Sequence, residues 1–372
     1  MSVNKKAITY IFLNGRKERI NSELNFPYEF FYGYNFLKDF YSENNLIEFN
    51  YQNKSIILKI LEKLLNKMSD LPFFFQYITT LKNYKIIKNT DDIVMTNQRV
   101  AFSSLIMILM GKLRKEINVY IFVMGLLDKK VNYKIKEFFR RLFIKILFST
   151  SKKLFFLSKG EYEFTKNNFQ KYQDKFIFEP FCIDLDFWEP KKESNSLNDK
   201  VNILFIGNDG SRDYEFIKSL VNESESINFN LISNNFNKDD FNKNVNLFNG
   251  SWVENKISDE EIRNFYHDAD LTIIPLIDTL QPSGQSVALQ SIACGTPVLI
   301  TKTAGFWDPT KFKNKNNIIF FDKNETNLWL KEIETLHKNR LLMSTLMENG
   351  LKTIEENYSL KNFYKNLKIH LE

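Results

Sequence analysis

The chain contains few residues of the kinds that form cross-links and metal sites. Its 372 residues include only two cysteines, Cys182 and Cys294, and three histidines, all of which follow residue 260. The two cysteines lie too far apart in the sequence to suggest a metal-ligand motif, and they imply no disulfide framework. No Asp-x-Asp or histidine cluster occurs where a metal site would be expected. This composition fits a reducing cytoplasm best.

Long hydrophobic runs are also lacking. The longest apolar stretches, 100–111 and 117–127, are shorter than the roughly 20 residues that a membrane-spanning helix needs. The apolar run 7–13 is followed by Asn-Gly-Arg-Lys without a small-residue cleavage site, so it predicts a buried strand and not a signal peptide. With 43% hydrophobic and 26% charged residues, the chain has the composition of a soluble globular protein, and its length favours two domains.

Positive charge is concentrated in the first half. Residues 1–185 carry 30 Lys and Arg against 18 Asp and Glu, whereas the remainder carries 21 against 27. A basic half suggests an anionic partner, although lysines can also simply solvate helices. The segment 129–148 interleaves basic and apolar residues, which predicts either a helix lying on an anionic membrane surface or an ordinary helix packed on a sheet. No recognisable nucleic-acid-binding module is present, so we expect no nucleic acid partner.

Strand-like apolar runs alternate with helical patterns in both halves, which predicts an α/β fold with two parallel-sheet domains. We expect a first domain at 1–188, a polar linker at 189–200, a second domain at 201–357 and a C-terminal helix at 358–372 that packs back toward the first domain. Ligands of such sheets bind at the carboxyl ends of the strands, which for two domains means the cleft between them. The predicted strands are 8–13, 93–95, 119–124, 154–157, 201–207, 228–232, 245–248, 271–275, 298–301 and 318–321, and the predicted helices are 30–41, 56–66, 101–111, 133–148, 213–222, 258–267, 286–294 and 326–338.

The segment 282–297, PSGQSVALQSIACGTP, is the most informative stretch of the chain. Its Pro-Ser-Gly start ends the preceding element, and apolar residues at helical spacing then predict a short helix from Ser286. The start of such a helix presents backbone N–H groups at its positive end, which suits a phosphate or diphosphate. Gln290 lies one turn further on, about 6 Å along the axis, where it could contact a ribose. The other interpretation is a capped helix packed under a sheet.

The second half resembles, in order, the donor domain of the family 4 retaining glycosyltransferases, which have the two-domain GT-B fold. The resemblance is strong over 200–360 and weak before 150. It rests on NILFIGNDGSRDY (202–214), IRNFYHDADLTIIP (262–275), LQSIACGTPV (289–298), NNIIFF (316–321) and ENYS (356–359), and near the end of the first half on LS (157–158), KFIFEP (175–180) and ID (183–184).

The chain departs from this family at the positions expected to hold the nucleotide. Gln290 stands where the family has the second glutamate of its Glu-x7-Glu motif, and Pro282 stands at the first. Asn208 takes roughly the place of the family's arginine, and Arg212 that of its lysine with one residue deleted. A carboxamide lacks the charge assistance of a carboxylate, so we expect Gln290 to bind a ribose more weakly.

The resemblance implies a site in which helix amides and an arginine neutralise a departing nucleoside diphosphate, with no metal and with no cofactor other than the nucleotide-sugar co-substrate. Arg212 is the predicted catalytic residue. The predicted donor-binding residues are Gly207, Asn208, Ser283, Gly284, Gln285, Ser286, Val287 and Gln290, and loops after first-half strands are expected to supply Gly15, Arg16, Asn97 and Gly125 on the acceptor or diphosphate side.

The implied activity is transfer of a sugar, with retention, from a nucleotide sugar to a glycan or lipid-linked acceptor in the synthesis of cell-surface polysaccharide or glycolipid. We expect such an enzyme in the cytoplasm, including the inner face of the membrane. The missing glutamate pair and the lack of a first-half histidine leave a second interpretation, a GT-B binding or scaffold subunit without turnover. A nucleotide-sugar epimerase on the same fold would need paired acid and base groups, for which the first half offers no histidine.

Overall fold

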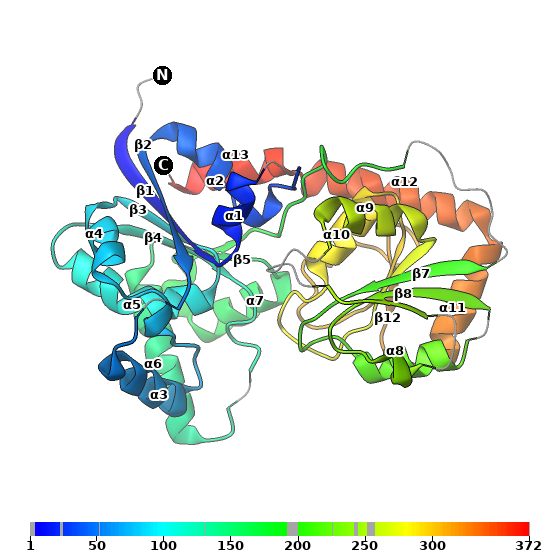
Figure 1. The fold of residues 1–372 in the computed structure, drawn as a ribbon, viewed down its shortest axis with the longest axis horizontal. Coiled ribbons are helices and arrows are strands. Elements are labelled where there is room, and N and C mark those ends of the chain that lie inside the picture. The colour runs from blue at the N-terminus through cyan, green and yellow to red at the C-terminus, as the bar shows by residue number, and fades with distance from the viewer. Residues whose placement is uncertain are drawn as a thin grey trace. The chain divides into compact units, whose positions relative to one another are not determined.

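The computed structural model describes residues 4–22, 25–51, 53–129, 131–191, 200–224, 226–241, 245–250 and 257–371, and most of the predicted linker, 189–200, lies outside them. The chain forms two compact units (Figure 1). Unit 1 consists of Met1–Leu24, Phe31–Glu179 and Asn366–Glu372, and unit 2 consists of Asn25–Phe30 and Pro180–Lys365. Each unit therefore takes one short segment from the sequence range that mainly builds the other.

Unit 1 is built on a six-stranded parallel sheet with the strand order β2-β1-β3-β4-β5-β6. Every residue of β3 is buried, which is typical of a parallel strand with helices on both faces of its sheet. The elements of this part of the chain are β1 (Asn4–Leu13), α1 (Arg16–Asn21), η1 (Glu29–Phe31), α2 (Tyr34–Leu37), η2 (Lys38–Phe40), β2 (Tyr41–Phe49), α3 (Ile56–Ser69), η3 (Phe75–Tyr77), α4 (Leu81–Asn89), β3 (Asp92–Met95), α5 (Gln98–Lys112), β4 (Asn118–Val123), α6 (Lys134–Thr150), β5 (Lys153–Phe156), α7 (Lys159–Asn168), η4 (Gln170–Lys175) and β6 (Phe176–Phe178).

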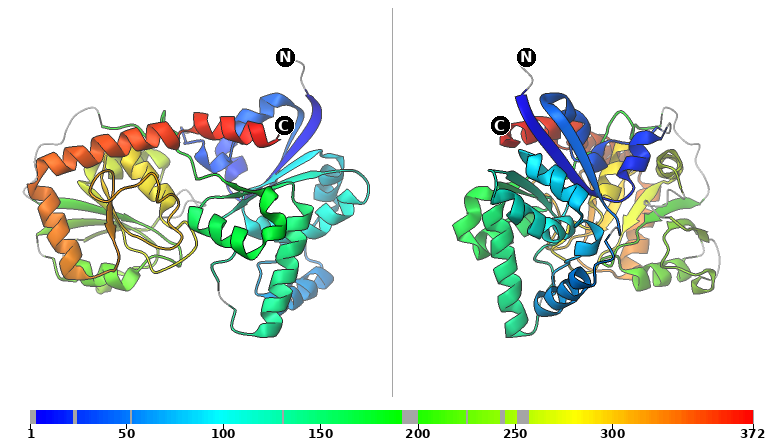
Figure 2. Two further views of the ribbon diagram at one scale, coloured as in Figure 1. Left: turned by 180° about the vertical axis from the view of Figure 1, so that it is seen from behind. Right: turned by 60° about the vertical axis from the view of Figure 1, so that its left-hand side comes forward.

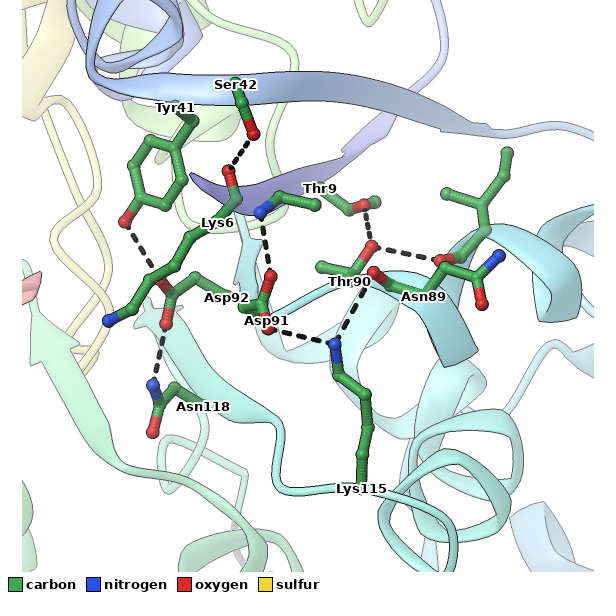
Figure 3. Close-up of polar contacts among 12 residues, drawn as sticks. Lys6, Thr9, Tyr41, Ser42, Asn89, Thr90, Asp91, Asp92, Lys115 and Asn118 are labelled. Atoms are coloured by element: carbon green, nitrogen blue, oxygen red, sulfur yellow. Dashed lines mark hydrogen bonds and ion pairs between the residues drawn. The ribbon is translucent and has the colours of Figure 1, made fainter. Parts of the chain in front are cut away.

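Two adjacent carboxylates join the amino ends of four strands of this sheet (Figure 3). Asp91 accepts hydrogen bonds from the backbone of β1 at 2.8 Å and from Lys115 Nζ at 2.9 Å. The fully buried Asp92 accepts from the hydroxyl of Tyr41 on β2 at 3.0 Å and from Nδ2 of Asn118 on β4 at 2.8 Å. A buried carboxylate costs free energy unless it is hydrogen-bonded, and the bonds from Tyr41 and Asn118 satisfy Asp92. Both aspartates lie at the amino ends of the strands, opposite to the carboxyl ends.

Unit 2 is built on a second six-stranded parallel sheet, with the order β12-β11-β10-β7-β8-β9. Side-chain capping defines the start of α9, where Ser258 and Glu261 form a capping box. The buried Trp329 of α11 stacks on Phe321 of β12 and so fixes that helix on the sheet. The remaining elements are β7 (Val201–Ile206), α8 (Tyr214–Asn222), β8 (Ile227–Ile232), η5 (Lys238–Asp240), β9 (Val245–Phe248), α9 (Asp259–Asp268), β10 (Leu271–Ile274), α10 (Gln285–Ala293), β11 (Val298–Thr301), β12 (Ile319–Phe321), α11 (Thr326–Lys338), α12 (Arg340–Asn357) and α13 (Leu360–Leu371).

The strands predicted from apolar runs are confirmed, and β9, β11 and α11 have the predicted bounds. The sequence did not predict β2, whose first residues are polar and partly exposed at the sheet edge, nor α4 and α12. The predicted helix 30–41 is interrupted, because Tyr32 and Gly33 have φ angles of 48° and 83°. Among the described residues, no helix is both long enough and apolar enough to cross a bilayer.

Buried glutamates make the stability of unit 1 dependent on pH. Burial raises the pKa of Glu179 from 4.5 to about 7, and the hydrogen bond from Asn366 offsets only part of this shift. An acid with a raised pKa in the folded state favours folding at low pH, and this contribution is lost as pH rises from the unfolded value toward the folded one.

We therefore expect Glu179→Gln to raise the melting temperature relative to wild type at pH 8.5 and to leave it unchanged at pH 4.5. The corresponding increase in the free energy of unfolding at pH 8.5 should be on the order of 3 kcal/mol at most, since one pKa unit corresponds to about 1.4 kcal/mol. Differential scanning calorimetry of wild type and Glu179→Gln at the two pH values measures the change in melting temperature. An equal change at both pH values would contradict a raised pKa of Glu179.

Candidate functional site

A cavity of about 330 Å³ lies in unit 2 at the carboxyl ends of β7, β8 and β9. We call it the unit 2 cavity. The last residues of β7 and β8, Ile206 and Ile232, line it together with Gly250, which follows β9. Of the predicted site residues it is lined by Gly207, Asn208, Arg212, Ser286, Val287 and Gln290.

Arg212 lies in the loop between β7 and α8, and the structure holds it beside the strand end. The backbone of this loop is hydrogen-bonded to the segment after β10, with Asp213 N–H donating to Pro275 O and Ile277 N–H to Ser211 O, both at 3.0 Å. A Cβ atom at Gly207 would lie 2.6 Å from Arg212 Nε, so only glycine lets the guanidinium pack this closely. The Arg212 side chain is 3% exposed.

A carboxylate already occupies one face of this guanidinium. Asp209 Oδ2 accepts a hydrogen bond from Arg212 Nη1 at 2.9 Å, and Asp209 Oδ1 accepts from the Ser211 N–H. The Asp209 side chain is 36% exposed, so it is hydrated while Arg212 is not. The arrangement shows that Arg212 can hold an anionic oxygen at the edge of the cavity.

The start of α10 supplies backbone donors to the same region. Gly284 precedes the helix with φ 77° and no side chain caps the helix. The bond from Ala288 N–H to Gly284 O, 2.9 Å, is the first to follow the helical pattern, so the amides of Ser286 and Val287 belong to the open first turn. A Cβ atom at Gly284 would lie 3.7 Å from Arg212 Nη1, which places the helix start next to the guanidinium.

Ser283, Gly284 and Gln285 were predicted to bind a ligand, but they stand just before or at the first position of α10 and do not line the cavity. Ser283 is 5% exposed. Its Oγ has no hydrogen-bond partner among the residues that the structure describes. A buried hydroxyl without a partner is costly, and a ligand oxygen at the helix start would satisfy it.

Asn208 lines the cavity but its side chain connects strand ends. Its Nδ2 donates to Gly250 O at 2.7 Å, and its Oδ1 accepts from Ser233 Oγ at 3.2 Å and from the Asn234 N–H at 2.6 Å. These bonds link the carboxyl ends of β7, β8 and β9. They leave Asn208 little capacity to contact a ligand through its side chain.

Gln290 is 6% exposed and faces the cavity one turn along α10. Its Oε1 accepts from the Tyr266 hydroxyl at 3.2 Å, and its Nε2 donates to Glu29 at 3.1 Å. Trp188, which also lines the cavity, donates its indole N–H to Glu29. Glu29, Trp188 and Tyr266 were not named as site residues from the sequence, and no spacing signal connects them to Gln290.

The predicted acceptor-side residues lie in unit 1, at the carboxyl ends of the neighbouring strands β1, β3 and β4. Gly15 has φ 93°, as a close backbone approach would require, but the N–H groups of Arg16 and Lys17 both donate to Glu48, at 2.7 and 2.9 Å. Arg16 is 8% exposed, and burial lowers its pKa to about 10.

The other two predicted acceptor-side residues also have partners within unit 1. Asn97 caps α5 through Val100 N–H, and the N–H of Gly125 donates to the buried Glu161. Each of these contacts gives the residue a structural role. A role toward an acceptor stays a prediction.

Metal-binding groups are sparse in the described part of the chain. No cluster of three or more His, Cys, Asp or Glu side chains occurs there that could hold a metal ion. Two Asp-x-Asp sequences occur in unit 2, and carboxylates of both already have protein partners. Asp184 of the first accepts from the N–H groups of Tyr28 and Asp186. In the second, Asp268 pairs with Lys191 and Asp270 accepts from the Asn202 N–H at 2.8 Å. The anion-binding groups described above are therefore a guanidinium and backbone amides.

No family model and no curated protein matches the chain. Solved structures do. Sucrose-phosphate synthase from Thermosynechococcus elongatus matches with a TM-score of 0.72 over 98% of this chain and 98% of its own, at 13% identity. HepE from Anabaena in complex with UDP matches with a TM-score of 0.65 over 98% of this chain and 99% of its own, at 11% identity. The catalytic domain of starch synthase IV from Arabidopsis thaliana, bound to ADP and acarbose, matches with 0.61 over 99% of both chains, at 12% identity. The chain has the GT-B fold, with two parallel-sheet α/β units.

Proposed function

We propose that the protein is a metal-independent retaining glycosyltransferase of the family 4 type, which moves a sugar from a nucleoside-diphosphate sugar to a glycan or lipid-linked acceptor. The observation that carries the proposal is the start of α10. An uncapped helix start, the partnerless Ser283 hydroxyl and the buried Arg212 guanidinium lie together at the carboxyl end of a parallel sheet. Helix amides, a hydroxyl and a guanidinium are the donors that a diphosphate requires.

In the proposed reaction, the bond between the anomeric carbon and the diphosphate oxygen breaks, and its electron pair leaves with the diphosphate. An acceptor hydroxyl bonds the same face of the anomeric carbon, and its proton passes to the departing phosphate. Negative charge builds on the diphosphate in the transition state, where the first-turn amides of Ser286 and Val287 and the Arg212 guanidinium would stabilise it. Asp209 must release Arg212 Nη1, or share it, when the diphosphate binds.

The nucleotides bound to the matched proteins indicate which ligands to test first. HepE was crystallised with UDP and with UDP-glucose, and starch synthase IV with ADP. The unit 2 cavity combines the polar groups described above with apolar lining residues such as Ile206, Ile232 and Val287, which suits a nucleoside. Cell-surface polysaccharide or glycolipid synthesis is the proposed setting.

The first test is binding of UDP, ADP and the corresponding nucleosides, measured by isothermal titration calorimetry. Arg212→Ala should weaken diphosphate binding by about 10-fold to 100-fold, because a hydrogen bond to a charged group contributes about 1.5–3 kcal/mol. Nucleoside binding should be unchanged. Lys218→Ala removes a nearby lysine of α8 that pairs with Glu215 and Asp240, and serves as the matched control. Equal losses for nucleoside and diphosphate in Arg212→Ala would contradict the proposed role.

The second test concerns turnover and stereochemistry. An active transferase should release free sugar slowly from UDP-glucose or ADP-glucose without an acceptor, and proton NMR of the sugar as it is released should show the anomeric configuration of the donor. Release with inverted configuration would contradict retention. Donor binding with no hydrolysis and no transfer would instead indicate a subunit without catalytic activity.

We extend the proposal to attachment at an anionic membrane surface through unit 1. On α6, the apolar side chains Ile135, Phe138 and Leu142 are exposed along one stripe, within the basic segment 129–148. The neighbouring helix α3 packs against α6 (Figure 2) and exposes Ile60 and further apolar residues beside a row of lysines. Apolar residues next to lysines match the chemistry of an anionic bilayer surface.

We expect Phe138→Ser and Ile60→Ser each to reduce co-sedimentation with vesicles of phosphatidylcholine and phosphatidylglycerol at low salt. Leu328→Ser is the control, because Leu328 is an exposed apolar residue of α11 in unit 2. Equal recovery of wild type in the supernatant with neutral and anionic vesicles would count against membrane attachment.

A further inference from the structure

Glu29, a buried glutamate from a distant part of the sequence, is hydrogen-bonded to the Gln290 side chain. Glu29 belongs to the segment Asn25–Phe30, which is part of unit 2 although its neighbours in sequence belong to unit 1. Glu29 is 1% exposed, and the next residue, Phe30, lines the unit 2 cavity. Glu29 Oε1 accepts hydrogen bonds from Gln290 Nε2 at 3.1 Å and from Trp188 Nε1 at 2.7 Å.

These contacts decide which way the Gln290 carboxamide is turned. Glu29 Oε1 also accepts from the Trp188 indole N–H, which can only donate, so this oxygen is an acceptor and the Gln290 atom bonded to it is the nitrogen. The amide oxygen is then the atom that accepts from the Tyr266 hydroxyl, at 3.2 Å. An amide oxygen has two acceptor positions. Tyr266 uses one, which leaves the second for a hydroxyl group of a molecule in the cavity that Gln290 lines.

We propose that Glu29 is a positioning residue of the nucleotide site, which holds the Gln290 carboxamide so that its oxygen accepts a hydrogen bond from a ribose hydroxyl. The inference rests on the proposed function and deepens it, because it makes the site selective for ribonucleotides. An amide that donates to a carboxylate is polarised by it, so its oxygen becomes a stronger acceptor. The carboxyl group thus acts through Gln290 and does not touch the nucleotide.

The surroundings of Glu29 support such a role. No lysine, arginine or histidine of the described residues forms an ion pair with it, so only hydrogen bonds stabilise its charge. Burial raises its pKa to about 8, the bonds from Gln290 and Trp188 oppose this shift, and Asp184 adds to it. A desolvated carboxyl group next to a cavity is typical of functional sites.

The proposal predicts a pH dependence, because Glu29 ionises between pH 7 and 9. The other ionisable groups that face it are Asp184, Tyr266, Cys294 and Tyr364. Burial raises the pKa values of both tyrosines and of the thiol above their ordinary values, so these groups stay neutral in this range. Ionisation of Glu29 strengthens the hydrogen bond from Gln290 and with it the preference for a ribose hydroxyl.

The experiment compares UDP with 2′-deoxy-UDP, and ADP with 2′-deoxy-ADP, by isothermal titration calorimetry on the full chain at pH 7 and 9. Wild type should bind the ribonucleotide about 10-fold tighter, the worth of one good hydrogen bond, and the ratio should be larger at pH 9. Each pair of ligands carries the same diphosphate, so phosphate ionisation cancels in the ratio.

Three variants separate positioning from a purely structural role. Glu29→Ala should reduce the ratio to within about 2-fold, because the Gln290 amide then loses both the hydrogen bond that fixes its orientation and the carboxyl group that polarises its oxygen. Glu29→Gln keeps an acceptor oxygen and should keep the preference for ribose while losing its pH dependence. Glu179→Gln removes another buried glutamate, in unit 1, and should leave both the ratio and its pH dependence as in wild type.

The outcomes distinguish this inference from the proposed function. If wild type binds neither UDP nor ADP, both fail together. If wild type prefers the ribonucleotide and Glu29→Ala prefers it equally, the positioning role is wrong and the proposed function stands. Should Glu29→Ala not fold, the pH comparison between wild type and Glu29→Gln decides alone, and a pH dependence that survives in Glu29→Gln overturns the inference.

Discussion

The candidate site depends on two close approaches that only glycine permits. At Gly284, a Cβ atom would lie 2.6 Å from Ile274 at the end of β10, and at Gly207 it would lie 2.6 Å from Arg212 Nε. The first contact seats the start of α10 directly on the sheet, and the second seats a guanidinium on the end of β7. Helix amides and a fixed cation therefore meet at one sheet edge, where a larger residue at either position would force them apart.

The part of the site that the sequence predicted follows from this architecture. Arg212, Ser286 and Gln290 were assigned to one site from the resemblance to a glycosyltransferase donor domain, and all three line the unit 2 cavity. They meet there because ligand sites of parallel sheets form at the carboxyl ends of the strands. Glu29 could not be found in this way. It is separated from Gln290 by 261 residues, and its segment carries no periodic pattern that would indicate a buried partner. The partnership arises only from the tertiary fold.

Unit 1 illustrates the opposite case. Gly15 was singled out as a place where the backbone could approach an anion, and it has the required positive φ. The anion that this backbone binds is the Glu48 carboxylate of β2. The sequence did not predict β2, because its first residues are polar. Asn208 shows the same limit in unit 2, since the sequence gives its position in the loop but not the three strand-end contacts that use its side chain.

Because Asn25–Phe30 belongs to unit 2, the N-terminal part of the chain affects how unit 2 folds during synthesis and how stable a C-terminal fragment is. The Glu29 carboxyl group leaves the ribosome long before Trp188 and Gln290, so it stays without these two hydrogen-bond donors until most of the chain has been synthesised. A fragment that starts after the N-terminal unit would contain Trp188 and Gln290 with their shared acceptor missing. Each buried donor left without an acceptor costs about 1–3 kcal/mol, so we expect unit 2 to be less stable in such a fragment than in the full chain.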